Sequence, residues 1–191
     1  MVKNLTTVKK KNYAQRLNVK KRVRYLTASQ NIFPGTAFSG AANYRRSNAI
    51  TTIEIDFRHQ VRQIAAAILN SKGTARRQVL SQMLLDQLNR GAELPECRVK
   101  ISDTRQYHRR SRGRIVFRQY GYYQPRTRYV YLQNRTPGRG QTFAPQSFLT
   151  TLLHEWLHHY DTYRLGLHSI HTRGFYLRLK SLRQLIGVPT G

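Results

Sequence analysis

The chain has 191 residues, and its 34 lysines and arginines outnumber its 8 aspartates and glutamates to give a formal net charge of +26. This length fits one domain with a tail and excludes two large domains. Charges of one sign repel one another in a compact chain, so the excess predicts an anionic partner, for which nucleic acid is the simplest candidate. Arginine supplies 25 of the bases, and its planar guanidinium pairs with phosphate through two hydrogen bonds.

Cysteine content and hydropathy narrow the class of protein further. Cys97 is the single cysteine, which excludes an intrachain disulfide and a zinc site built from cysteines, so histidine and carboxylate must hold any metal. The N-terminal sequence lacks the apolar run of a secretory signal, and no stretch reaches the roughly 18 apolar residues of a membrane span. We therefore expect an intracellular protein, cytoplasmic or associated with the nucleoid, that does not enter the membrane.

Residues 1–50 contain eleven bases and no acid, and their apolar residues follow neither the period of a strand nor that of a helix. This composition predicts an extended or disordered basic arm. One interpretation is a solvated tail, and the other, which we favour, is an arm that lies on phosphates. The bases expected to contact nucleic acid there are Lys9, Lys10, Lys11, Lys20, Lys21 and Arg22.

Two helices are predicted at the start of the remaining domain, residues 51–191. Apolar residues recur at helical spacing from about residue 51, and Asn70 and Gly73 end the pattern. A second pattern ends at Gly91, which is typical of a helix C-terminus. The residues that this second pattern places on one buried face are Val79, Met83, Leu84 and Leu88.

Three short strands follow, at Arg98–Ile101, Arg114–Tyr120 and Thr127–Gln133, and they predict a small sheet of about three strands. Arginines and tyrosines are interleaved around them, as in surfaces that bind single strands by base stacking and phosphate pairing. A solvated strand face that is rich in tyrosine is the alternative. The arginines assigned here to nucleic acid are Arg109, Arg110 and Arg112.

The last predicted helices carry the residues with recognisable chemistry. Pro145 is expected to begin a helix that runs to about Tyr163, and it contains the sequence His154-Glu155-Trp156-Leu157-His158. Residues four apart in a helix differ by about 40° around its axis, so both imidazoles can reach one ion. In this pattern two histidines hold zinc and the glutamate is the general base for hydrolysis, because zinc lowers the pKa of its bound water towards about 7.

A catalytic zinc site needs a third protein ligand and an open position. His159 points about 100° away from His158 and is expected to miss the metal. His168 and His171 both follow a break in the helix at Gly166. We favour His171, because the apolar stripe of a final helix would hold it, and we expect His168 in a connector or at the surface. The residues of that stripe are Phe175, Leu179, Leu182 and Ile186.

Other polar residues near this motif have open roles. Asp161 is predicted either to orient an imidazole by accepting its second N–H or to be a surface or capping acid. The sequence does not choose an oxyanion-stabilising group among Tyr160, Tyr163 and Tyr176.

These motifs resemble the SprT-like, or Spartan-type, zinc metalloprotease domain over about residues 75–187. The specific parts are the helix with His154, Glu155 and His158 and the later pair His171 and Phe175 at the start of the final helix. The resemblance implies an α+β fold with a small zincin-like metallopeptidase core, in which a short sheet packs on helices. It also implies zinc on His154, His158 and His171, with Glu155 as catalytic base. Members of the family degrade proteins on DNA, including covalent DNA–protein crosslinks, which would account for the positive charge.

Two functions from different classes follow from the sequence. The first is a zinc-dependent metalloprotease that acts on proteins bound or crosslinked to DNA, with the strand Tyr129–Leu132 pairing to an extended substrate by edge addition. The second is a non-catalytic DNA- or RNA-binding protein with a structural zinc site. A zinc hydrolase for bonds other than peptide bonds is a third option that the sequence does not separate from the first.

Overall fold

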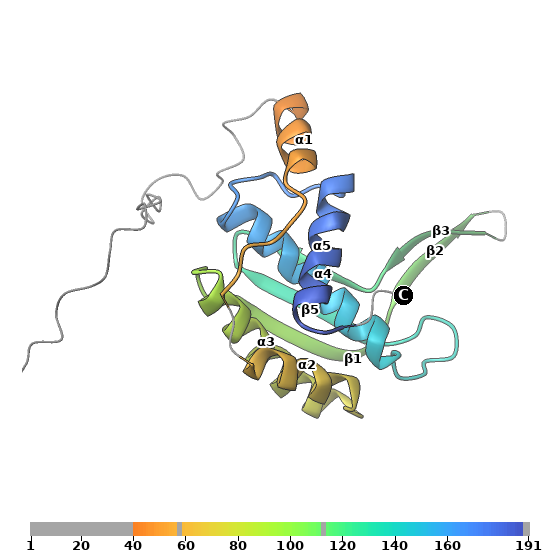
Figure 1. Ribbon diagram of the computed structural model, residues 1–191. Coiled ribbons are helices and arrows are strands. Elements are labelled where there is room, and N and C mark those ends of the chain that lie inside the picture. Colours follow the sequence, from red (N-terminus) through yellow and green to blue (C-terminus); the bar gives the residue numbers. More distant parts are fainter. Residues whose placement is uncertain (1–39, 57–58, 112–113, 189–191) are drawn as a thin grey trace, which may run out of the picture. The chain divides into compact units, whose positions relative to one another are not determined.

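Three helices, then five strands, then two helices follow one another in the computed structural model, which describes residues 40–56, 59–111 and 114–188 (Figure 1). This arrangement confirms the predicted α+β class. The helices are α1 Gly40–Ala49, α2 Gln60–Leu69, α3 Thr74–Gly91, α4 Pro145–Tyr163 and α5 Arg173–Leu185. The strands are β1 Arg98–Arg105, β2 Tyr107–Ser111, β3 Arg114–Gln119, β4 Gly121–Gln124 and β5 Tyr129–Arg135.

The main sheet has three strands in the order β1-β5-β4, with β5 parallel to β1 and antiparallel to β4. Alternate residues of β5 are buried, and Val130 and Leu132 face the core. The prediction that Tyr129–Leu132 pairs with a substrate by edge addition is wrong, because both edges of this central strand are already hydrogen-bonded to neighbouring strands.

The two outer edges of the sheet differ. Along β1, the side chain of Gln78 donates to the carbonyl of Val99 and accepts from the N–H of Ile101. Gln82, one turn further along α3, accepts from the N–H of Val99 and donates to the carbonyl of Cys97. The two glutamines therefore cover the β1 edge. The other edge, β4, is the one next to α4.

A second, two-stranded sheet pairs β2 with β3 in an antiparallel hairpin that projects from the body in Figure 1. The predicted strand Arg114–Tyr120 therefore lies in this hairpin and not in the main sheet, whose third strand is β4. Arg109 and Arg110 lie on β2, whereas Arg112 and the predicted bases between Lys9 and Arg22 lie outside the described residues.

The structure differs from the two predicted N-terminal helices of the domain in the start of the first and in the buried face of the second. Residues 50–56 are not helical, and α2 begins only at Gln60, although Ile53 is buried as expected. On α3, Val79 and Met83 are 54% and 47% exposed and do not belong to the core face. That face instead includes Arg77, whose guanidinium lies 4.6 Å from the centre of the Phe148 ring and donates to the carbonyl of Phe143. A basic residue in the core broke the expected apolar pattern.

The end of the predicted basic arm forms α1, so the expectation of an extended segment through residue 50 is wrong for residues 40–49. This helix packs closely on the start of α5. A Cβ atom on Gly174 would lie 1.9 Å from the carbonyl oxygen of Ser47, so glycine is required there. The weak apolar pattern of α1 reflects its polar contacts, in which Asn43 and Ser47 are the buried residues.

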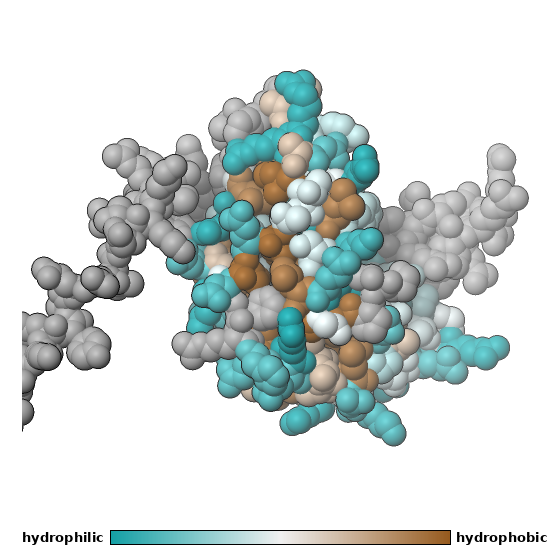
Figure 2. All heavy atoms as spheres, viewed as in Figure 1, coloured by the Kyte–Doolittle hydropathy of each residue, from teal (hydrophilic) through white to brown (hydrophobic). Residues whose placement is uncertain are grey.

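Apolar residues come to the surface in the middle of the face shown in Figure 2, and hydrophilic residues surround them. Within the described ranges, no helix is both long and apolar enough to cross a membrane.

Candidate metal centre

Helix α4 holds the two histidines of the motif at the edge of the core. Pro145 occupies its first turn, and one side of the helix is fully buried through Leu149, Leu153 and Trp156. The indole N–H of Trp156 donates to the side chain of Asn89 on α3 at 2.8 Å, which fixes the rotation of α4. His154 and His158 therefore face the opposite direction, into a cleft.

The third histidine comes from the segment between α4 and α5. The Nε2 atom of His171 lies 2.9 Å from Nε2 of His154 and 3.1 Å from Nε2 of His158. Within the described residues, these three are the histidine, cysteine or acidic side chains close enough to hold one metal ion, with all ligand atoms within 4.8 Å of one another. The structure thus brings together the three ligands that the sequence predicted.

The donor set fits a metal ion in geometry and in protonation. Nitrogens that bind one tetrahedral ion at about 2.1 Å are about 3.4 Å apart, close to the distances found here. Burial, followed by the neighbouring His171, lowers the pKa of His154 to about 4. Burial and the two adjacent imidazoles lower the pKa of His158 to about 3. Neutral imidazoles present a lone pair to a metal, so His154 and His158 are ready to bind one at neutral pH.

Glu155 lies beside this cluster and faces β4. Burial raises the pKa of its carboxyl to about 7, and a hydrogen bond from the backbone N–H of Tyr123 opposes that shift. Glu155 and the three histidines line one cleft of about 1050 Å³, which β4 borders on the other side. The carboxylate is therefore held by the edge strand within the cavity that contains the histidines.

His159 misses the cluster, as predicted, and has a structural role. It is fully buried, with Nδ1 2.8 Å from the hydroxyl of Tyr123 and Nε2 3.0 Å from the carbonyl of Pro95. The carbonyl can only accept, so Nε2 carries the proton and Nδ1 accepts from the hydroxyl. Because His159 lies one turn after Glu155, it fixes the same strand whose backbone N–H holds the Glu155 carboxylate.

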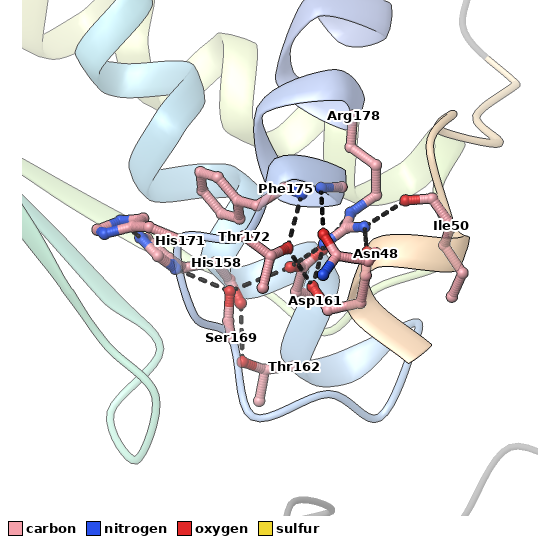
Figure 3. A network of polar contacts seen from close by, with 12 residues as sticks. Asn48, Ile50, His158, Asp161, Thr162, Ser169, His171, Thr172, Phe175 and Arg178 are labelled. Atoms are coloured by element: carbon pink, nitrogen blue, oxygen red, sulfur yellow. Dashed lines mark hydrogen bonds and ion pairs between the residues drawn. The ribbon is translucent and has the colours of Figure 1, made fainter. Parts of the chain in front are cut away.

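Asp161 orients His158 through an intermediate hydroxyl, a variant of the first role predicted for it (Figure 3). Nδ1 of His158 lies 2.8 Å from Oγ of Ser169, which donates to the Asp161 carboxylate at 3.1 Å. A metal held by Nε2 would leave the imidazole proton on Nδ1, which would then donate to Ser169. The predicted alternative, a surface acid, is wrong because Asp161 is fully buried.

A buried ion pair completes this network. Arg178 on α5 donates from Nε and Nη2 to the two carboxylate oxygens of Asp161, at 2.9 and 2.7 Å, and both side chains are fully buried. Burial raises the pKa of the Asp161 carboxyl, and the guanidinium opposes that shift by stabilising the carboxylate. Arg178 also donates to the carbonyls of Ser47 and Ile50. Arg178 was not predictable from the sequence, because an arginine within a helix of a basic protein looks like a surface residue.

Helix α1 holds the segment that carries His171. The amide of Asn43 donates to the carbonyl of His168 and accepts from its N–H, while the His168 side chain is exposed. Ser47 and Thr172 share a hydrogen bond of 2.8 Å, and Asn48 accepts from the N–H of Gly174. His168 is therefore held by its backbone and lies outside the three-histidine cluster.

Two of the three tyrosines near the motif are used elsewhere. The hydroxyl of Tyr160 hydrogen-bonds to the backbone of Glu54, and that of Tyr163 donates to the carbonyl of Pro125. Tyr176 is exposed, and its ring centre lies 6.0 Å from that of His171.

We expect Asp161→Asn to destabilise the fold and to weaken metal binding. Removing the carboxylate leaves the Arg178 guanidinium buried without its counter-charge, which typically costs about 3–5 kcal/mol. Loss of the support behind a ligand typically weakens metal affinity about 10- to 100-fold. Thermal melting and competition with a chelator measure the two effects. In the matched control, Asp103→Asn, the lost partner is the exposed Arg135, and stability is expected to change by no more than about 1 kcal/mol. Equal melting temperatures for the two variants would contradict this role of Asp161.

Comparison of the chain with protein-family models, with curated proteins and with solved structures gives no match.

Proposed function

We propose that the protein is a zinc-dependent metallopeptidase that acts on proteins bound or crosslinked to DNA. One observation carries the proposal: three imidazole Nε2 atoms converge in an open cleft beside a buried carboxylate. Three protein ligands with room for a further one are typical of catalytic zinc, whereas structural zinc usually has four protein ligands. The similarity to the SprT-like domain in the motif around His154 and in the pair His171 and Phe175 supports the same choice.

The roles of the residues follow from their positions in the cleft. Zinc held by His154, His158 and His171 would supply Lewis acidity and a water of lowered pKa. Glu155 would accept the proton of the attacking water and pass it to the leaving amine. The backbone N–H of Tyr123 donates to the Glu155 carboxylate and orients it, and the hydrogen bond with Ser169 orients the ring of His158.

Among the described residues no strand pairs with the outer edge of β4, and this open edge supports a polypeptide substrate. In the ladder with β5, the N–H of Gln133 donates to the carbonyl of Tyr120. The alternation of an antiparallel ladder therefore turns the N–H and carbonyl of Gly121 away from β5, toward the open edge. An extended peptide would add to β4 by these groups and pass through the cleft. The proposed edge strand for substrate binding is therefore β4 and not β5, for which the sequence predicted it.

The positive charge of the chain supports the proposal that its substrates are proteins attached to DNA. A net charge of +26 attracts polyanions and raises the local concentration of proteins attached to them. A protease recruited in this way would encounter substrate at DNA more often than in free solution.

The test uses the full chain loaded with one equivalent of zinc and a protein covalently crosslinked to a DNA oligonucleotide. We expect the crosslinked protein to be cleaved. 1,10-Phenanthroline should inhibit this cleavage, and added zinc should restore it. Gel electrophoresis measures the cleavage. The same protein without DNA is the control and should be cleaved more slowly. If the zinc-loaded chain binds DNA but cleaves neither form, the peptidase proposal fails and the DNA- or RNA-binding function with a structural metal replaces it.

A further inference from the structure

The main sheet has a second face, directed away from the buried one, that the proposed chemistry does not use. Strand alternation assigns to it every second residue of each strand, opposite to the buried Val99, Ile101, Val130 and Leu132. All of its side chains are exposed or half-buried. We call the part of it formed by six of these residues the outer face: Arg98, Lys100, Tyr122, Gln124, Tyr129 and Tyr131.

Three tyrosines form the centre of the outer face. Tyr122 on β4 is opposite Tyr131 on β5, and their rings stack with centres 5.3 Å apart and planes 21° from parallel. Tyr122 is 40% exposed. Tyr129 lies two residues before Tyr131 on β5 and therefore on the same face, and burial and the hydroxyls of Tyr122 and Tyr131 raise its pKa. Large aromatic rings on a solvated sheet face offer stacking surfaces.

Positive charge borders these tyrosines along β1. Arg98 is in register with Tyr129, and Lys100 with Tyr131, so each of these two tyrosines has a base at the paired position of the neighbouring strand. Arg98 has one long, exposed ion pair with Glu96 at 3.9 Å, which solvent screens, and Asp103 pairs with Arg135 at 3.2 Å. The outer face therefore combines rings with cations at strand spacing.

We propose that the outer face binds single-stranded nucleic acid, with bases stacked on Tyr122, Tyr129 and Tyr131 and phosphates paired with Arg98 and Lys100. Stacking on a flat sheet requires bases that are not already paired and stacked in a duplex, which selects single strands. The basic border matches the phosphate backbone and would make binding dependent on salt.

The position of this surface links it to the cleft. Tyr122 belongs to the outer face and also lines the cavity that contains Glu155. A strand on the outer face would therefore present an attached protein beside β4. The presentation of an attached protein to the cleft rests on the proposed peptidase function, but the binding of a single strand to the outer face does not.

The test measures binding with the zinc-loaded Glu155→Gln chain, in which cleavage does not interfere. A fluorescent oligothymidine of about 12 nucleotides and a duplex of equal length are compared by anisotropy. We expect the double variant Tyr122→Ala/Tyr131→Ala to bind the single strand at least about 10-fold more weakly, with duplex affinity unchanged within about twofold. Tyr44→Ala is the matched control, since Tyr44 is an exposed tyrosine on α1, and it should bind as the parent does.

Two further measurements keep the proposal testable if the double variant folds poorly. Lys100→Gln should lower the slope of log K against log salt by about 0.7, the value for one phosphate contact to a single strand. Photocrosslinking to 5-iodouracil should give adducts on Tyr122, Tyr129 or Tyr131. An unchanged affinity in the double variant, an equal loss for duplex, or adducts confined to other residues would overturn the proposal. Cleavage of a crosslinked protein is scored separately, so tyrosine-dependent binding without proteolysis would refute only the peptidase function.

Discussion

Replacing Glu155 with glutamine is expected to slow peptide hydrolysis by about 100- to 10,000-fold while leaving one zinc ion bound per chain. The amide has almost the same shape as the carboxylate but cannot accept the proton of the attacking water, and general-base catalysis contributes a factor of that size. Zinc should stay, because the ligand cluster consists of three histidine nitrogens. Turnover of a crosslinked protein and metal content by atomic absorption measure the two quantities.

Glu96→Gln is the matched control for this change. Glu96 is an exposed acid with a weak contact to Arg98, so the same substitution there should leave turnover unchanged. If Glu155→Gln retains full activity with zinc bound, Glu155 is not the base and the reaction uses another acceptor. If the variant loses zinc, the carboxylate is part of the ligand set, which contradicts the separation of roles proposed above.

A large loss of metal affinity is expected from His171→Ala. This change removes one of three ligand atoms, and the two remaining imidazoles come from one helix and leave half of the coordination sphere to water. We expect zinc affinity to fall by more than about 100-fold, beyond the range typical of residues that only support a ligand. Competition with a chromophoric chelator measures the affinity, and the thermal shift produced by zinc gives an independent value, because a ligand that binds only the folded chain stabilises it.

His168→Ala controls for this experiment within the same segment. The His168 side chain is exposed, and its contacts with Asn43 use backbone atoms that alanine keeps. Its zinc affinity should equal that of the unchanged chain. A loss of zinc in His168→Ala alone would mean that the segment rearranges around the metal and that the ligand assignment is wrong.

The relation between His154, Glu155 and His158 was predictable because it is local. One helical turn places the two imidazoles on one face and the carboxylate on the next, and the apolar residues from Phe148 to Trp156 ensured that the segment would be helical. The bounds of α4 and the alternation along the start of β1 followed from the same short-range rules. The choice of His171 was also predictable, since it precedes an apolar stripe with spacings of three or four residues in α5.

Other features were not predictable because their cause lies far away in the sequence. The sequence of β4, Gly-Tyr-Tyr-Gln, is too short to show the alternation of a strand, and it becomes the edge strand because β5 offers hydrogen bonds and α4 offers Glu155 and His159. The polar helix α1 is stabilised by contacts more than 120 residues away, as between Ser47 and Arg178. Composition alone classed it with the basic arm.

The amino-acid sequence by itself determined the residue types that could hold a metal, their spacing on α4 and the positive charge of the chain, because each depends on neighbouring residues or on a sum over all of them. Only the tertiary structure decided that Asp161 and Arg178 are buried behind the candidate ligand His158, that β4 is an edge strand of the main sheet and that three tyrosines share one sheet face. Burial and strand pairing depend on which distant segments come together, and no local pattern contains that information.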